Sequence, residues 1–134
     1  MTNFYFAYVP DVNNPNRTMT IAYTISGNRV RFGFSINAPT EWVCAYSSQE
    51  RITFVKKPGD QFNKRKGKEI AIGRYESRKS TTLVTSGTLN KRDALIEILN
   101  FLAITQGNRH VSRMAKQEAE YLLWCCKMDE GKAR

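Results

Sequence analysis

Two arginines near the C-terminal end of the chain have a spacing suited to binding an anion. Arg109 and Arg113 are four residues apart in a stretch with helical periodicity, so their side chains leave one face of the helix a turn apart. Each guanidinium can bind a phosphate through two hydrogen bonds, and the positive end of the helix dipole adds to the attraction. The alternative, two solvated arginines beside an apolar stripe, fits the same pattern equally well.

A second basic cluster lies between residues 60 and 74, where five lysines and arginines fall within eleven positions, Lys64 to Arg74. Asp60 is predicted to cap a helix there through its carboxylate. Gly67 and Gly73 weaken such a helix by roughly 1 kcal/mol each, which predicts a close backbone approach or a bend. A charge run is most often a solvated surface. Here we expect a cationic helix held down by a narrow apolar seam, made of Phe62, Ile70, Ala71 and the stem of Arg74.

The residues that catalysis requires are scarce. His110 is the only histidine, so the chain offers no Cys–His or Ser–His–Asp set beyond that one residue. It contains no GxxxxGK[ST] phosphate loop. Cys44, Cys125 and Cys126 have the spacing of neither a zinc site nor a disulfide framework. We therefore expect a binding protein and not an enzyme, with no metal and no cofactor.

The composition predicts a soluble globular protein with an anionic partner. At 134 residues the chain has the length of one domain. Its 21 basic and 12 acidic residues give a net charge of +9, which favours nucleic acid, nucleotides or anionic lipid. The odd cysteine count fits a reduced compartment. Neither a signal peptide nor an 18-residue apolar run is recognisable, so we expect a cytoplasmic protein without a membrane span.

The first 87 residues predict mainly β-strands. Apolar alternation is clearest over residues 19–26 and 29–37, which flank a Gly27-Asn28 hairpin turn. Residues 10–17 are rich in Pro, Asn and Asp and predict a loop. Shorter strands are expected at 4–9, 42–46, 51–57 and 81–85, with one helix between 60 and 78.

After residue 87 the apolar period changes to that of a helix. Helices are predicted at 91–105, capped by Thr88 or Asn90, and at 109–128, followed by a polar tail at 129–134. Their expected buried residues are Leu95, Ile98, Leu99, Leu102 and Ala103 in the first, and Val111, Met114, Ala115, Tyr121, Leu122 and Cys125 in the second. The chain is therefore predicted to be a single α+β domain, an antiparallel sheet with C-terminal α-helices packed on one face.

Residues 60–74 also resemble a pattern of small phage proteins, Asp-x-Phe-x-Lys-x-x-Gly-Arg/Lys-x-Ile-Ala-x-Gly-Arg. The specified positions are filled by Asp60, Phe62, Lys64, Gly67, Lys68, Ile70, Ala71, Gly73 and Arg74. On these residues the chain resembles the type one Thoeris anti-defence proteins. Members of that family are phage sponges that bind and sequester cyclic ADP-ribose isomers made by bacterial TIR-domain enzymes, and they can also hold cyclic oligonucleotides.

The resemblance implies a sheet packed with helices, a dimer or higher homo-oligomer with ligand pockets at subunit interfaces, and binding without turnover. It implies that Arg109 and Arg113 contact ligand phosphates, that Asn90 holds the ribose and that Phe62 stacks on the adenine. Lys68 replaces an expected arginine and loses bidentate geometry. The predicted ligand-binding set is completed by Lys64, Lys68 and Arg74.

Other functions fit the same charge. A basic phage protein that binds single-stranded nucleic acid is the main alternative, and its affinity would fall steeply with salt because it would contact many phosphates. An inhibitor that blocks a host protein, and an enzyme that cleaves the nucleotide, are further alternatives. Capture of a host protein from lysate would support the inhibitor. Recovery of the intact nucleotide after the protein is denatured by heat would argue against the enzyme.

Overall fold

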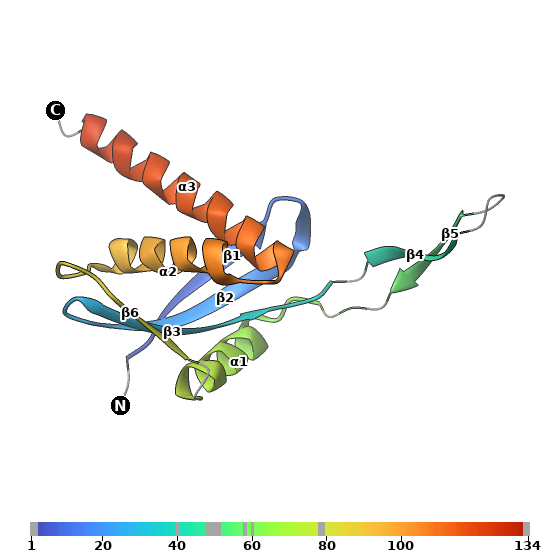
Figure 1. Cartoon of the computed structure of the whole chain (residues 1–134), viewed down its shortest axis with the longest axis horizontal. Coiled ribbons are helices and arrows are strands. Elements are labelled where there is room, and N and C mark those ends of the chain that lie inside the picture. Colours follow the sequence, from blue (N-terminus) through green and yellow to red (C-terminus); the bar gives the residue numbers. More distant parts are fainter. Residues whose placement is uncertain are drawn as a thin grey trace.

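The computed structural model describes residues 3–39, 41–47, 52–57, 59, 61–77 and 80–132. Four antiparallel strands form a sheet in the order β1-β2-β3-β6, with helix α1 on one face and helices α2 and α3 on the other (Figure 1). The elements are β1 (Tyr5–Asp11), β2 (Asn14–Ser26), β3 (Arg29–Ile36), β4 (Glu41–Ser47), β5 (Ile52–Lys57), α1 (Lys64–Glu76), β6 (Thr81–Val84), α2 (Lys91–Thr105) and α3 (Arg109–Lys132). The α+β prediction, with two C-terminal helices on an antiparallel sheet, is confirmed.

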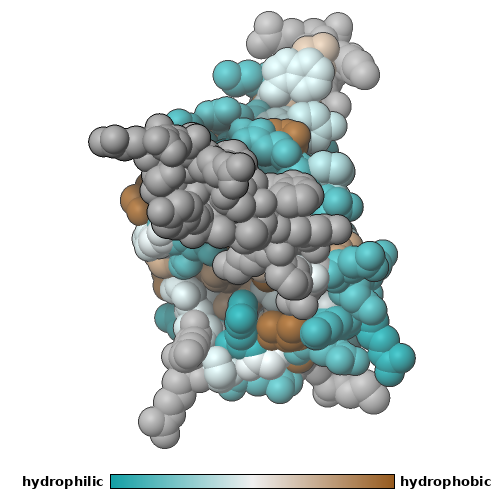
Figure 2. Space-filling view, turned by 90° about the vertical axis from the view of Figure 1, so that its right-hand side faces the viewer, coloured by the Kyte–Doolittle hydropathy of each residue, from teal (hydrophilic) through white to brown (hydrophobic). Residues whose placement is uncertain are grey.

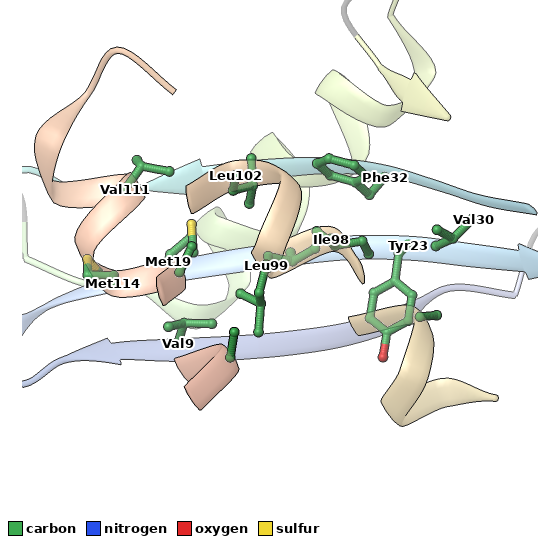
Figure 3. Close-up of a cluster of buried hydrophobic side chains, with 14 residues drawn as sticks. Val9, Met19, Tyr23, Val30, Phe32, Ile98, Leu99, Leu102, Val111 and Met114 are labelled. Carbon is green, nitrogen blue, oxygen red and sulfur yellow. The ribbon is translucent and has the colours of Figure 1, made fainter. Parts of the chain in front are cut away.

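The β2–β3 hairpin is the centre of the sheet and matches its prediction closely. Gly27 has a φ of 61°, a left-handed conformation that favours glycine, and Tyr23 pairs with Phe32 across the two strands. The apolar alternation predicted from the sequence places Tyr23, Val30 and Phe32 on the face that α2 and α3 cover (Figure 3).

The predicted loop at 10–17 is wrong. β1 continues to Asp11 and β2 begins at Asn14, so the connection is a two-residue turn. The register shifts between Pro10 and Asp11, and the Asn13 N–H donates to the Asp11 carboxylate. The Pro, Asn and Asp residues therefore shape a tight hairpin, in which side-chain hydrogen bonds and a bulge accommodate the residues that usually break strands.

Helices α2 and α3 supply the other half of the main core. Ile98, Leu99 and Leu102 of α2 are fully buried, and Val111 and Met114 of α3 are almost fully buried (Figure 3). The α2 bounds agree with the predicted 91–105. Ala94 is also buried and was not predicted, whereas Leu95 and Ala103 are only partly buried against the core.

The prediction fails in the second half of α3. Tyr121 is 57% exposed instead of buried, and Leu122 and Cys125 are half-buried. The reason is geometric: α3 has 24 residues, and towards its C-terminus it rises at an angle away from α2 and the sheet (Figure 1). The apolar stripe continues beyond the surface that could cover it.

Helix α1 packs on the opposite face of the sheet. Its N-cap is Asn63, whose side-chain oxygen accepts from the Lys66 N–H, so Asp60 is not the cap; Asp60 itself lies outside the described residues. Ala71 is fully buried, and the backbone of α1 passes so close to Gly33 that a Cβ there would lie 2.3 Å from the Tyr75 nitrogen. A glycine in β3 thus sets the distance between the helix and the sheet.

The strand pattern predicts that Arg31, on the side away from the main core, points into water, and this prediction is wrong because α1 covers the side chain. Its guanidinium lies 4.4 Å from the centre of the Tyr75 ring and donates to the Tyr75 carbonyl and to Ser80. The two remaining strands, β4 and β5, pair with each other in a hairpin that extends away from the sheet (Figure 1). In the described part of the chain, no helix is both long and apolar enough to cross a membrane.

Candidate anion-binding site

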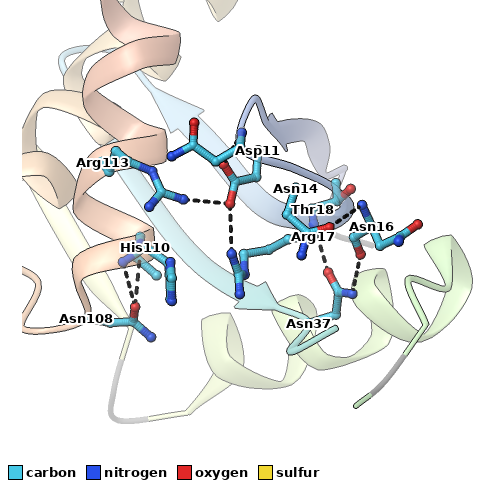
Figure 4. Close-up of polar contacts among 11 residues, drawn as sticks. Asp11, Asn14, Asn16, Arg17, Thr18, Asn37, Asn108, His110 and Arg113 are labelled. Carbon is cyan, nitrogen blue, oxygen red and sulfur yellow. Dashed lines mark hydrogen bonds and ion pairs between the residues drawn. The ribbon is translucent and has the colours of Figure 1, made fainter. Parts of the chain in front are cut away.

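A buried carboxylate joins the tip of the β1–β2 hairpin to the first turn of α3. One oxygen of Asp11 accepts from Arg17 at 2.9 Å and from Arg113 at 2.6 Å, while its other oxygen accepts from the Asn13 N–H at 2.9 Å (Figure 4). The Asp11 side chain is fully buried and that of Arg17 is 6% exposed. Arg113 is 30% exposed, so it forms the solvent side of this cluster.

The charge state of Asp11 follows from these contacts. Burial favours the neutral acid and would raise the pKa of Asp11. The hydrogen bond from Asn13 and the guanidiniums of Arg17 and Arg113 outweigh burial and hold the pKa below its ordinary value of 3.8. Asp11 is therefore a carboxylate at neutral pH and fixes the direction of the Arg113 side chain.

Arg113 has a hydrogen-bond donor, Nε, that is buried and has no partner among the described residues. Arg109 lies one helical turn earlier and is exposed. The first turn of α3 contains no acidic residue, so the positive end of this helix has cationic side chains beside it. Such an arrangement is mildly unfavourable by itself and becomes favourable when an anion binds.

Asn108 accepts hydrogen bonds from backbone N–H groups at the N-terminus of α3. Its side-chain oxygen accepts from the His110 N–H at 2.9 Å and, more weakly, from the Val111 N–H at 3.4 Å (Figure 4). The coloured surface at this end of the molecule is mainly hydrophilic, with apolar side chains in small separate areas (Figure 2). Arg109 is exposed and Arg113 is partly exposed, so an anion can approach both from water.

Asp11 and Arg17 were not among the predicted site residues. The sequence contains one indication that Asp11 matters, since it is the only acidic residue among the first 40. A single acid within a basic segment commonly has an arginine partner, since an isolated buried carboxylate is costly. The sequence did not reveal that the partner on α3 would be Arg113.

Asn90 lies elsewhere. It caps α2, and its side-chain oxygen accepts from the Asp93 N–H at 2.8 Å. The 15 residues of α2 separate Asn90 from Arg109 by about 22 Å at 1.5 Å per residue. One small ligand cannot touch both residues in one subunit.

The four predicted residues of the 60–74 stretch gather on the α1 face of the sheet. Lys64 lies 4.7 Å from the centre of the Tyr8 ring, and Phe62 packs edge-on against the same ring at 6.4 Å. Lys68 and Arg74 make similar contacts with the sheet: the ammonium of Lys68 lies 4.8 Å from the Phe6 ring centre, and Arg74 donates to the Phe34 carbonyl. These contacts dock α1 on β1 and β3.

The basic stretch and the paired arginines therefore lie on opposite faces of the sheet. Tyr8 faces α1, whereas its neighbour Val9 and Asp11 face α2 and α3, because side chains alternate along a strand. The structure places Phe62, Lys64, Lys68 and Arg74 along one face of the sheet, and Arg109 and Arg113 on the other. It does not bring the two groups together in one subunit.

An open pocket of about 360 Å³ near the start of α2 has a size suited to small ligands. Lys91 and Arg92 line it together with Tyr23, and Ala7, Leu95 and Leu122 complete its apolar wall. In the part of the chain that the structure describes, no group of three or more His, Cys, Asp or Glu side chains could hold a metal ion. Comparison of the chain with protein-family models, curated proteins and solved structures found no match.

Proposed function

We propose that this protein is a phage anti-defence sponge that binds cyclic nucleotide immune signals and sequesters them without degrading them. Cyclic ADP-ribose isomers are the first candidates, and cyclic oligonucleotides are the second. The resemblance of residues 60–74 to the type one Thoeris anti-defence proteins supports the ligand class. One structural observation supports the mode of binding: buried Asp11 holds Arg113 in place, one turn from the exposed Arg109, at a helix start without acidic residues.

The contact with Asp11 should strengthen the binding of a phosphate to Arg113. A free arginine loses side-chain entropy when it binds a phosphate, whereas Asp11 has already restricted Arg113. Its partly buried position also reduces screening by water, which strengthens a charge-assisted hydrogen bond from the exposed part of its side chain. Arg109 can bind a second phosphate oxygen from the adjacent turn.

We propose a homo-oligomer as the active form. Four large apolar side chains of α3 are exposed, in the half that rises away from the sheet: Tyr121, Leu123, Trp124 and Met128. Exposed apolar surface of this kind favours association. A second subunit could close the pocket over Arg109 and Arg113, and could add residues of its own α1 face, which one subunit alone keeps away from α3.

Single-stranded nucleic acid remains the competing ligand because of the +9 charge. The aromatic rings on the α1 face favour it less, since Lys64 and Lys68 already lie over Tyr8 and Phe6 and occupy ring surface that bases would need. Salt separates the two ligands. A nucleotide pocket with two or three phosphate contacts loses affinity gently, whereas a strand-binding groove loses it steeply.

Native mass spectrometry with a panel of cyclic nucleotides tests the proposal directly, because it reports the ligand mass and the number of subunits together. We expect one of the panel to bind with its mass unchanged, and to be recovered intact after the protein is denatured by heat. Recovery of a cleaved product would show an enzyme instead. Binding of oligonucleotides alone, with a steep salt dependence, would support the nucleic-acid alternative.

Two variants locate the ligand. Arg109→Ala removes an exposed guanidinium, and Arg113→Lys keeps a cation for Asp11 but loses the Nε donor and the planar fork. Each should weaken nucleotide binding by about tenfold or more, as expected for loss of a charged hydrogen bond. Lys116→Ala, an exposed position on the same helix, has the same loss of charge and is the control for Arg109→Ala. Equal affinity in all three variants and the wild type would remove Arg109 and Arg113 from the site.

A further inference from the structure

A small pocket lies between the first turn of α1 and the sheet, on the face opposite Arg113. Its floor comes from β2 and β3, and its rim comes from the loop before α1 and from α1 itself. Two apolar side chains form one wall, namely Phe62 and Ile70, while Ile36 lines the pocket although its side chain packs against the main core on the other face of the sheet. The remaining side chains that line it are polar or basic, except at Gly67, and Lys66 is the one cation among them.

Thr20 on the floor of this pocket has an unused hydroxyl. The residue is fully buried, and its Oγ1 has no hydrogen-bond partner among the described residues. The hydroxyl is directed at the first turn of α1, since a Cβ added to Gly67 would lie 2.7 Å from it. A buried hydroxyl without a partner costs about 1–3 kcal/mol, so a polar group that satisfies it gains binding energy.

Two polar side chains that line the pocket, Ser35 and Asn37, are already hydrogen-bonded to other groups. Ser35 donates its hydroxyl to the Gly67 carbonyl, and Asn37 bonds the Thr18 N–H and the Asn16 carbonyl (Figure 4). Lys66 has no ion-pair partner among the described residues, and no described carboxylate lines the pocket. A hydroxyl and an ammonium without a nearby carboxylate suit an oxyanion and not a metal ion.

The volume restricts the size of the ligand. The pocket measures about 70 Å³, well below the 300 Å³ at which sites for whole small molecules begin. It is large enough for more than one water molecule. We propose that it is an oxyanion site that takes one phosphate group, either inorganic phosphate or the terminal phosphate of a nucleotide whose remainder stays outside. Thr20 donates to the phosphate from below and Lys66 supplies the countercharge at the rim.

This inference does not depend on the proposed sponge function. Within one subunit the two sites lie on opposite faces of the sheet and share no residue. A variant of one therefore leaves the other available for measurement.

The experiment is a titration by isothermal calorimetry with inorganic phosphate, and separately with adenosine monophosphate, at constant ionic strength. Thr20→Val keeps the shape of the side chain and removes the hydroxyl, while Lys66→Gln removes the charge. Arg65→Gln is the matched control: it makes the same charge change one residue away, at a side chain that is 90% exposed and paired with Glu69. Circular dichroism checks that each variant folds.

We expect phosphate to bind the wild type and Arg65→Gln alike, and at least about tenfold more weakly to Thr20→Val and Lys66→Gln. Tighter binding of adenosine monophosphate would identify the terminal phosphate of a nucleotide as the source, and equal binding would identify the free ion. The proposal is overturned if Thr20→Val binds phosphate like the wild type, if Arg65→Gln loses as much as Lys66→Gln, or if no phosphate binds. Thr20→Val should keep its affinity for cyclic nucleotides, so the two sites can fail separately.

Discussion

Asp11 and Arg113 are 102 positions apart in the chain, and their side chains meet at 2.6 Å. The contact joins the tip of the β1–β2 hairpin to the first turn of α3, at the place where we propose that a phosphate binds. The same carboxylate therefore stabilises the fold and directs a binding residue. Its removal should affect both properties.

Asp11→Asn should lower the free energy of unfolding by about 3 kcal/mol, because it leaves buried Arg17 and half-buried Arg113 without their counterion. Urea denaturation followed by circular dichroism measures this loss. The control is Glu69→Gln, which breaks the exposed ion pair with Arg65 and should change stability by less than about 0.5 kcal/mol. Equal effects of the two substitutions would contradict the role of Asp11.

The stability contributed by Asp11 should depend on pH in a defined direction. Its pKa in the folded protein is below the ordinary 3.8, so the folded state binds the proton less readily than the unfolded state. The contribution is complete above about pH 5 and is lost as the pH falls through the folded pKa. The difference in unfolding free energy between the wild type and Asp11→Asn should be constant from pH 7 to 5 and shrink toward pH 2.5. A difference that does not shrink at all between pH 5 and pH 2.5 would show that charge is not its source.

Gly33→Ala should displace α1 from the sheet. The added Cβ would lie 2.3 Å from the Tyr75 nitrogen and 2.6 Å from the Ala71 carbonyl oxygen, and neither backbone atom can move without the helix. We expect a loss of about 3 kcal/mol or more, at the upper end of the range for overpacking, measured by thermal or urea unfolding.

Gly73→Ala is the matched control within α1. A Cβ there has nothing within 4 Å, and alanine favours the helix over glycine by about 1 kcal/mol. This variant should be more stable than the wild type. Destabilisation by both substitutions would mean that α1 tolerates no change, and that the close approach at Gly33 is not the cause.

The sequence alone was enough for the elements whose pattern is local. The alternation around Gly27 predicted the β2–β3 hairpin, and the 3.6-residue period predicted α2 with its bounds. It also identified Arg109 and Arg113 as neighbours, since a helix places residues four apart on one face. In each case the residues that decide the structure lie within a few positions of each other.

Only the tertiary structure decided which surfaces and partners those elements meet. A strand pattern places Arg31 away from the main core, but the arrival of α1 covers that side and turns a solvated arginine into a packed one. An apolar stripe continues to Tyr121, but α3 has risen away from α2 and the sheet at that point (Figure 1), and the residue is exposed. Arg113 obtains Asp11 as its counterion only because the chain returns to the first hairpin after a hundred residues. Sequence periodicity encodes which side of an element is apolar, and long-range packing determines what covers it.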